Sequence, residues 1–460
     1  MNNIYVRILS IQLDGFKNVN HGKIDMPRFI SGDYTDEVSD ILGIYGQNGS
    51  GKTAIIDSLA FLKDMMMGKS LPKDTINYIG KNKEVATLKF KFYLKKHENE
   101  FLLSYEFSII KKDAEKVEIK SEIIKFSKLE NCKKLPESTL IKYDSQSKGI
   151  IFTPKYRYEQ LSKGNKENEI KINVAKIVSI KEQKSFVFSE ELRELWNDDE
   201  EDIMNVILSS LRLFAITDLF VIRNGHNGII TLDFAMPFSF KYEDGRNLSV
   251  GDMLLSLSEP TIFKTKEFDI FKIMIQEINF VIGALIPGLS IIIKEYGLQT
   301  TKDGKDGIRF ELLSKRGEEV IPLRYESEGI KKIISILNLL IAMYNNPSVC
   351  VAVDELDAGV YEYLLGELLG VIQETGKGQF IFTSHNLRPL EMINKSSLIF
   401  TTTNPENRYI RLTNVKNNNN LRDLYLRSIN LGGQKESIYE PTKTHEIRRT
   451  FRRAGRLLNE

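Results

Sequence analysis

The sequence predicts an α/β fold in which a mixed core sheet with helices carries an antiparallel β subdomain and an inserted, mainly helical lobe. Three patterns predict it. An apolar run at 41–45 leads through a glycine-rich turn into a segment with helical apolar spacing at 54–62. Three successive segments between 85 and 129 have the pattern of antiparallel strands. Two apolar strands late in the chain end in polar residues.

The glycine-rich turn runs from Gly46 to Thr53 as GQNGSGKT and matches the pattern G-x-x-x-x-G-K-[ST]. Glycines let successive backbone N–H groups converge on phosphate oxygens, and the N-terminus of the following helix adds positive potential. The pattern predicts that Lys52 contacts β- and γ-phosphates and that Thr53 binds Mg²⁺, but it does not distinguish a kinase, a GTPase and a motor. The other cradle residues are Gly46, Asn48, Gly49, Ser50 and Gly51. The strand before the turn and the helix after it argue against a plain glycine-rich turn.

The rest of the N-terminal part is expected to consist mainly of strands. Residues 4–13 roughly alternate between apolar and polar, which predicts a half-buried strand, and DGFKN follows as a turn. Segments 85–96, 100–110 and 116–129 predict three antiparallel strands with charged outer faces. Residues 127–175, rich in Lys, Asn, Ser and Gly, are expected to form loops with short strands.

The middle of the chain, from Ser189 to Pro287, changes to an acidic and helical composition, which indicates an inserted lobe. Beyond it we expect strands at 289–296, 308–314 and 320–325, then an amphipathic helix at 329–344. The expected domains are therefore an N-terminal lobe (1–188), a helical insert (189–286), a C-terminal lobe (287–425) and a basic tail (426–460).

The two late strands carry the second half of the predicted site. SVCVAVDELDAG places Asp354 and Glu355 at the carboxyl end of an apolar run, and QFIFTSHN does the same for His385. Parallel α/β sheets bind their ligands at this edge. We expect Asp354 to hold Mg²⁺, Glu355 to act as general base on the attacking water, and His385 to contact the γ-phosphate or that water. Strands that merely meet a polar loop are the alternative.

Composition limits the classes of function. The formal net charge is +2, from 64 basic and 62 acidic residues, so no global basic field indicates nucleic acid. Two distant cysteines, Cys132 and Cys350, indicate a reducing compartment without disulfides. The sequence shows neither a signal-peptide pattern nor an apolar stretch that would span a bilayer, so we expect a cytoplasmic protein without a membrane partner.

The order of the motifs resembles the ATPase heads of the ABC superclass, in particular the soluble RecF, SMC and OLD branch. After the phosphate loop come Ser327-Glu-Gly329 at a helix start, Asp354-Glu355, Asp357 and His385. The turn LDGFKN adds to the resemblance. The match covers residues 1 to about 62 and 287 to 412, and the middle of the chain carries no motif of this branch.

The resemblance implies an ABC-type head that binds ATP and Mg²⁺ as a sandwich homodimer or in a higher oligomer. It implies that Ser327 and Gly329 of one copy cap the γ-phosphate held by the other, that Asp357 couples the two sites, and that Lys17 and Asn18 lie near the phosphates or the base. Two departures affect this comparison: Glu328 lies inside the signature, and Tyr361 stands where the branch often has a histidine. Gln160 and Gln183 are weak candidates for the lid glutamine.

Two functions follow as hypotheses from the resemblance. The first is a nucleotide-gated sensor or regulator that holds or activates a separate effector, such as a Toprim-type nuclease, in anti-phage defence. ATPases of two-gene systems such as PARIS are similar in size and motif order, and abortive-infection and retron-associated ATPases compete with them. The alternative is a RecF- or SMC-like DNA-binding ATPase in repair or recombination, which the near-zero net charge and the acidic insert WNDDEED disfavour.

The C-terminal tail is the one strongly basic segment. Five arginines cluster on one or two faces of a predicted helix, and they are Arg448, Arg449, Arg452, Arg453 and Arg456. Such a helix suits an acidic protein partner, a nucleic acid or plain solvation, and all three remain open. Phe451 is the single aromatic residue among them, so the tail gives no support for base stacking.

Overall fold

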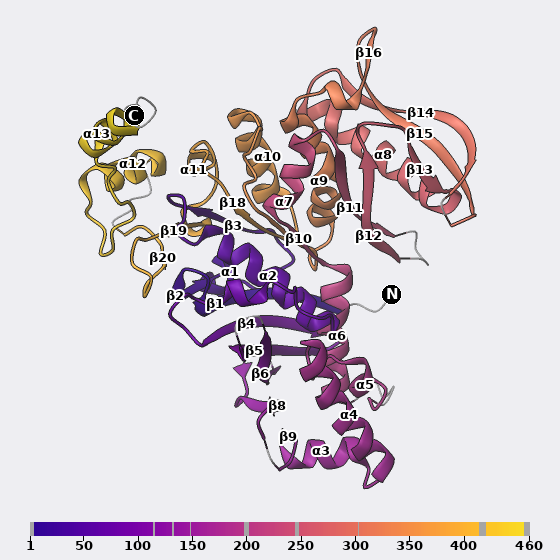
Figure 1. The fold of residues 1–460 in the computed structure, drawn as a ribbon, viewed down its shortest axis with the longest axis vertical. Coiled ribbons are helices and arrows are strands. Elements are labelled where there is room, and N and C mark those ends of the chain that lie inside the picture. The colour runs from indigo at the N-terminus through magenta and orange to yellow at the C-terminus, as the bar shows by residue number, and fades with distance from the viewer. Residues whose placement is uncertain are drawn as a thin grey trace.

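The computed structural model describes residues 4–113, 116–130, 133–147, 149–196, 202–243, 248–301, 303–413 and 420–454. A six-stranded sheet forms its centre, in the order β10-β17-β18-β3-β19-β20 (Figure 1). The first five strands are parallel, and β20 pairs antiparallel at the edge. Their bounds are β3 (Asp40–Tyr45), β10 (Leu219–Ile222), β17 (Cys350–Val353), β18 (Gln379–Thr383), β19 (Leu398–Thr401) and β20 (Tyr409–Ile410).

Helices cover both faces of this central sheet, as a parallel sheet requires. All six residues of β3 are buried, and its four large apolar side chains alternate between two hydrophobic clusters. Leu42 and Ile44 belong to the cluster that contains α2 (Lys52–Met67), whereas Ile41 and Tyr45 belong to the cluster that contains α9 (Glu328–Asn345) and α10 (Glu362–Thr375). Short helix α1 (Pro27–Ser31) contacts β3, and short helix α11 (Pro389–Met392) contacts α10. Because both faces of β3 are packed against helices, the loop that follows β3 starts from a fixed position in the sheet.

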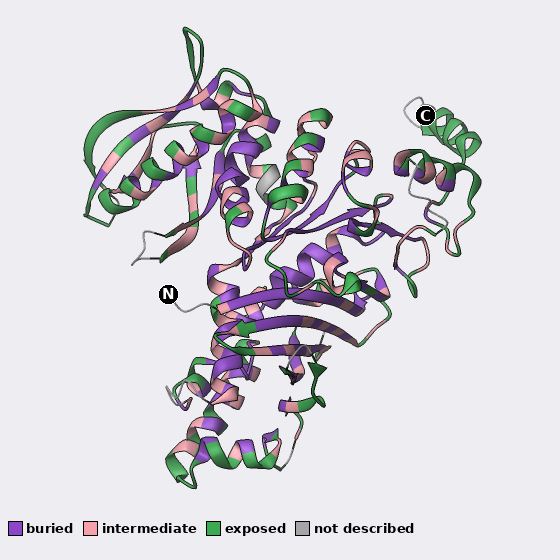
Figure 2. Cartoon of the chain, turned by 180° about the vertical axis from the view of Figure 1, so that it is seen from behind, coloured by how far each residue is buried: buried purple, intermediate pink, exposed green. Residues whose placement is uncertain are grey.

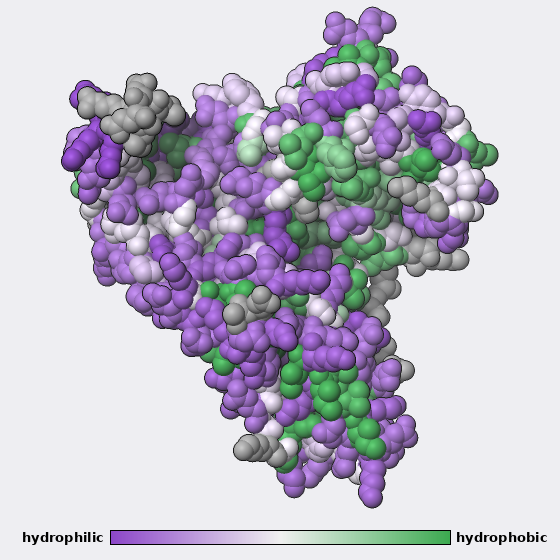
Figure 3. Space-filling model, viewed as in Figure 1, coloured by the Kyte–Doolittle hydropathy of each residue, from purple (hydrophilic) through white to green (hydrophobic). Residues whose placement is uncertain are grey.

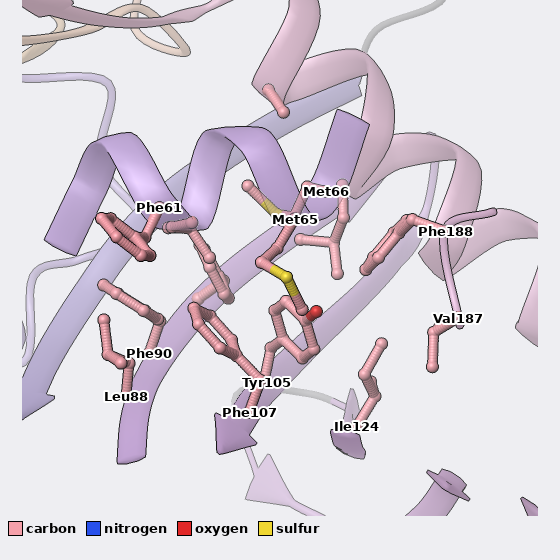
Figure 4. Packing of buried hydrophobic residues seen from close by; sticks show 14 of the residues in the cluster. Phe61, Met65, Met66, Leu88, Phe90, Tyr105, Phe107, Ile124, Val187 and Phe188 are labelled. Atoms are coloured by element: carbon pink, nitrogen blue, oxygen red, sulfur yellow. The ribbon is translucent and has the colours of Figure 1, made fainter. Parts of the chain in front are cut away.

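An antiparallel sheet packs on the other side of α2, in the order β2-β1-β4-β5-β6-β8-β9. Figure 4 shows Phe61 and Met65 of α2 facing Phe90 and Tyr105 of this sheet. The predicted strands are confirmed as β4, β5 and β6, with antiparallel pairing throughout. The bounds are β1 (Ile4–Phe16), β2 (Val19–Asp25), β4 (Val85–Lys96), β5 (Asn99–Lys111), β6 (Val117–Glu130), β7 (Lys133–Lys134), β8 (Ser138–Asp144) and β9 (Phe152–Thr153).

Four helices form a lobe beyond the antiparallel sheet: α3 (Lys155–Ser162), α4 (Lys166–Glu182), α5 (Glu190–Arg193) and α6 (Ile203–Thr217). The expectation of loops with short strands over 127–175 is wrong for α3 and for most of α4. Helix α4 is rich in Lys and Glu, which have good helix propensity, but it buries only three residues. The polar composition of α3 and the absence of a single apolar side on α4 therefore hid the helical pattern.

The segment 189–286 contains helices α5, α6, α7 (Asn224–Thr231) and α8 (Thr265–Leu285), but its expected limits do not enclose a separate unit. Strand β10 belongs to the central sheet, and β13 (Thr261–Lys264) pairs with β15 (Asp306–Arg316) beyond residue 286. That outer sheet also includes β14 (Leu289–Thr300) and β16 (Glu319–Pro322), and β11 (Ala235–Glu243) forms a hairpin with β12 (Leu248–Ser256). Apolar runs as short as LFVI in β10 cannot be assigned to strand or helix by pattern alone.

The C-terminal segment contains α12 (Leu421–Leu431) and α13 (Thr444–Ala454). The expected domain limit at 425 falls inside α12, whose Leu421 and Tyr425 are buried against the central sheet's cluster. By contrast, α13 has no buried residue and is exposed along its whole length in Figure 2. Within the described ranges, no helix combines the length and the apolar character needed to cross a membrane.

Candidate functional site

The loop between β3 and α2 has the backbone that the glycine pattern requires. Gly49 and Gly51 have φ values of 75° and 96°, which favour glycine. A Cβ on Gly46 would lie 1.7 Å from Oγ1 of Thr401, so the loop lies directly against β19. Ser50 Oγ donates to the carbonyl of Gln47 (2.6 Å). The loop is therefore a rigid turn with its backbone against the sheet edge.

Lys52 is the first residue of α2, and its side chain folds back into this loop. Its ammonium donates to the carbonyl oxygens of Gly46 (2.8 Å) and Gln47 (3.1 Å). Burial lowers the pKa of Lys52, and the carboxylates of Asp354 and Glu355 oppose that shift. The ammonium thus sits between the loop and the acidic end of β17.

Asp354 and Thr53 form a site suited to Mg²⁺. Thr53 Oγ1 donates to Asp354 Oδ1 (3.3 Å), and Thr383 Oγ1 donates to the same oxygen (2.6 Å). The other oxygen, Oδ2, is buried and has no hydrogen-bond partner. Among the described residues no group of three His, Cys, Asp or Glu side chains could hold a metal. One carboxylate, a hydroxyl and phosphate oxygens are the donor set that Mg²⁺ uses at nucleotide sites, so the residues fit it.

Glu355 follows Asp354 in a constrained turn. Its φ is 49°, a left-handed conformation uncommon for a residue with a side chain. The Glu355 N–H donates to Thr383 Oγ1 (2.7 Å), and its carbonyl accepts a hydrogen bond from the ammonium of Lys332 on α9. Lys332 is 3% exposed, and burial lowers its pKa to about 8 against the opposing charges of Asp357 and Glu355. Thr383 and Lys332, which the motifs did not single out, therefore hold this turn.

Asp357 and His385 meet where β18 ends. Asp357 Oδ2 accepts hydrogen bonds from the backbone N–H groups of His385 and Asn386, both at 2.9 Å. Burial and the charge of Lys52 lower the pKa of His385, so its imidazole is neutral at pH 7. Asp357 thus acts on the backbone of the histidine turn, while the imidazole faces the cavity.

These residues border a cavity of about 1360 Å³. The predicted residues that line it are Lys17, Asn18, Asn48, Gly49, Gly51, Lys52, Thr53, Asp354, Glu355 and His385. Gly46 and Asp357 lie behind this lining, in contact with Lys52 and His385. Ser50 does not line the cavity either, and it hydrogen-bonds the Gln47 carbonyl. The motifs did not point to the rest of the wall, which includes Asn20, Asn77, Lys81, Lys83, Lys111 and Arg408.

The turn before β2 closes one side of the cavity. Lys17, with φ 52°, forms an ion pair with Asp57 of α2, and Asn18 Nδ2 donates to the carbonyl of Gly49. Arg408 donates to the Asn18 carbonyl (2.7 Å), and its aliphatic part lies against Gly51. Asn18 therefore connects this turn to the phosphate loop at Gly49, and Arg408 connects it at Gly51.

Ser327 and Gly329 lie elsewhere, at the start of α9. Ser327 Oγ accepts from the N–H of Ile330 (3.4 Å), an N-cap, and a Cβ on Gly329 would lie 1.9 Å from the carbonyl oxygen of Gly359. Neither residue lines the cavity of its own chain. Gln160 and Gln183 do not line it either: Gln160 donates to Asp202 in the helical lobe, and Gln183 caps α4.

A phosphate loop, an acidic strand end and a histidine lie at the carboxyl edge of one parallel sheet, and a separate helix starts at Ser327 and Gly329. This is the arrangement of an ATPase head of the ABC superclass. A family model described as "AAA domain, putative AbiEii toxin, Type IV TA system" matches residues 41–391. The match begins in β3 and ends in α11, so it includes the phosphate loop, Asp354, Glu355 and His385. The chain belongs to this family.

Three solved SMC head structures are similar to the chain at 14% identity, each over 88% of it. One is bound to the C-winged helix domain of ScpA (TM-score 0.43, 97% of that chain covered). Another, from Pyrococcus furiosus, has an extended coiled coil and is bound to the C-terminal domain of ScpA (0.41, 96%). The third is from Thermotoga maritima (0.37, 99%). At these scores they support no further argument. No curated protein matches the chain.

Proposed function

We propose that the chain binds ATP with Mg²⁺ in the cavity and hydrolyses it. The observation that carries this is the unpartnered Oδ2 of Asp354, buried beside Thr53 and at the same cavity edge as Lys52, Glu355 and His385. Bound Mg²⁺ would neutralise charge on the β- and γ-phosphates. Thr53 and Asp354 would hold it.

The other residues of the edge have roles that follow from their positions. Lys52 exchanges the carbonyl oxygens of its own loop for phosphate oxygens, which keeps its ammonium satisfied in both states. Glu355 accepts the proton of the attacking water, since its constrained backbone directs it from the strand end towards the cavity. The neutral imidazole of His385 offers one donor and one acceptor to the γ-phosphate or that water.

We further propose that two copies form an ATP sandwich. Ser327 is exposed and caps the N-terminus of α9, which favours an anion, but it lies outside its own cavity. In a two-fold dimer this helix end can reach the γ-phosphate held by the other copy. Gly329 packs on Gly359, two residues after Asp357, so movement at one site would be transmitted to the other.

The biological role we propose is that of a nucleotide-gated regulator of a separate effector protein in anti-phage defence. The family description names a toxin and a type IV toxin–antitoxin system, which supports this role. A RecF- or SMC-like DNA-binding role is the alternative. It is favoured by the exposed α13, where Arg448, Arg449, Arg452 and Arg453 are available to phosphates, while Arg456 falls outside the described residues.

The test of ATP hydrolysis compares Glu355→Gln and Lys52→Ala with the parent chain. We expect Glu355→Gln to bind ATP within about threefold of the parent affinity and to lose about 10²-fold or more in hydrolysis, since general-base catalysis contributes on that scale. Lys52→Ala should lose ATP binding itself. Hydrolysis by Glu355→Gln at the parent rate would disprove the assignment of the base.

The same Glu355→Gln chain distinguishes the two roles. Held with ATP and Mg²⁺ and purified from its host, it should retain a stoichiometric protein partner without DNA if it regulates an effector. Nuclease-sensitive DNA without a protein partner would instead establish the DNA-binding role.

A further inference from the structure

Helix α4 is apolar on two opposite sides. One side, formed by Ile172, Ala175 and Ser179, is buried against the chain's own core. The opposite side carries Ile170, Val174 and Ile177, which are 62%, 42% and 64% exposed. Single exposed apolar residues are common on proteins, but three at helical spacing form a continuous stripe. A helix that is apolar on both sides has the pattern of one packed between two partners.

The exposed stripe continues at both ends into charged residues. Glu167, Ile170, Val174, Ile177 and Lys181 follow one another at intervals of three and four, the spacing of a helix-pairing seam. Val174 lies at the midpoint, seven residues from each charge. Glu167 is 73% exposed and Lys181 is exposed as well. In Figure 3 apolar side chains gather over the lobe that contains α4.

We propose that this face binds the same face of a second copy, with the two α4 helices antiparallel about a two-fold axis near Val174. The charges of Glu167 and Lys181 favour a second copy of the chain as the partner, and they favour the antiparallel arrangement. Antiparallel pairing places Glu167 of each copy opposite Lys181 of the other, whereas parallel pairing would oppose like charges at both ends. An isologous contact of this kind closes on itself and needs no other protein.

The contact is distinct from the ATP sandwich and requires no nucleotide. The stripe spans about 21 Å of helix, at 1.5 Å per residue. Two helices in contact over that length alone bury less area than a standard interface of about 1,200–2,000 Å², so a single pairing should be of micromolar strength. The sandwich dimer of the proposed function presents two such stripes, so each dimer can pair with others through both. ATP binding would therefore convert weak pairing into a larger assembly.

The test reverses the end charges and measures self-association of the full chain by sedimentation without nucleotide or Mg²⁺. Glu167→Lys alone and Lys181→Glu alone should each weaken the association about tenfold or more, because each opposes like charges twice. The double reversal should restore it. An equal mixture of the two single variants should also restore it, since each copy then supplies the charge that the other lacks.

Glu169→Lys is the matched control, because it reverses an exposed charge at the same end of α4 but off the stripe. It should leave the association unchanged. A chain that stays monomeric at all concentrations, an equal effect of Glu169→Lys and Glu167→Lys, or no recovery in the double variant would each overturn the proposal. Loss of binding to a separate protein without any change in self-association would also overturn it and assign the face to that partner. Repeating the series with Lys52→Ala separates this contact from the ATP sandwich.

Discussion

Lys332 connects two parts of the molecule through a single hydrogen bond. It leaves the signature helix α9 and holds the carbonyl of Glu355, whose φ of 49° has to be maintained by its surroundings. Its neighbour Lys331 is equally buried, but it pairs with Asp233 and with the carbonyl of Arg324, away from the strand end. The two lysines therefore form a natural comparison.

Lys332→Met should lower kcat for ATP about tenfold or more while the Kd for ATP stays within about threefold, because it loosens the Glu355 turn but leaves the phosphate loop intact. Lys331→Met should leave kcat near the parent value. Single-turnover hydrolysis and nucleotide titration measure both quantities. Equal effects of the two variants on kcat would show that Lys332 contributes to folding alone.

Gly329 gives a second prediction at this scale. A Cβ there would lie 1.9 Å from the Gly359 carbonyl, so Gly329→Ala must shift the start of α9 from the turn that follows Asp357. We expect retained ATP binding and a fall in kcat of about 10²-fold, the cost of a shift of about 1 Å in catalytic geometry. Gly370→Ala on α10 is the control, since its nearest contact is at 3.7 Å. A parent-like kcat for Gly329→Ala would argue against the coupling.

Sequence patterns identified the residues of this site that belong to local motifs. The phosphate loop, Asp354, Glu355 and His385 were predicted, because each follows a strand in a recognisable order. Thr383, Lys332 and Arg408 were not predicted, because each acts through a contact with a residue distant in sequence. A buried lysine in particular looks like any other lysine in a helical sequence.

Among the elements, β5, β6 and the segment before α5 are joined by one buried carboxylate. Glu122 accepts hydrogen bonds from Tyr105, Ser185 and the backbone N–H groups of Phe186 and Val187. Burial raises the pKa of Glu122, and these four donors only partly oppose it. The helical lobe is thus attached to the antiparallel sheet through a titratable group.

The stability of the parent chain should depend on this group. Because the folded pKa lies above the ordinary 4.5, the folded protein retains a proton that the unfolded chain releases, so the contribution is complete below pH 4.5 and declines as pH rises. Relative to Glu122→Gln, the parent should lose free energy of unfolding above pH 4.5, by at most about 1.4 kcal/mol per pH unit. Urea unfolding of both chains from pH 4.5 to 8 measures the difference. Parallel profiles would contradict the prediction.

Elements with a single apolar side were predicted well from the sequence. A helix with two apolar sides and a very short strand were not. Strands β4, β5 and β6 alternate, and α9 is amphipathic, so their patterns were distinct. Helix α4 is apolar on two opposite sides, which removes the one-sided signal. Strand β10 is only four residues long, and its place at the edge of the central sheet depends on pairing with β17, over a hundred positions later.

On the scale of the whole molecule, the cavity and the signature helix belong to different sites of the proposed dimer. Lys52→Ala removes the lysine that binds phosphate, and Ser327→Arg blocks the helix end that would contact the other copy's nucleotide. Each variant alone should therefore fail to hydrolyse ATP. Mixed in equal amounts, they should recover about a quarter of the parent activity, since half of the dimers then hold one intact site of two. ATP hydrolysis by the mixture measures this. Activity of Ser327→Arg alone at the parent level would show that the signature takes no part.

The order of the central sheet has a consequence for the synthesis of the protein. Strand β3 leaves the ribosome early, yet both of its neighbours, β18 and β19, lie more than 330 residues later. At ordinary translation rates this delay is roughly 20–70 s, during which a strand whose residues are all buried in the folded chain has two unpaired edges. The nascent chain therefore depends on the antiparallel sheet and α2 to shelter β3, or on a chaperone. The proposed ATP site cannot form until nearly the whole chain has been made, so we expect an incomplete chain to lack ATP binding.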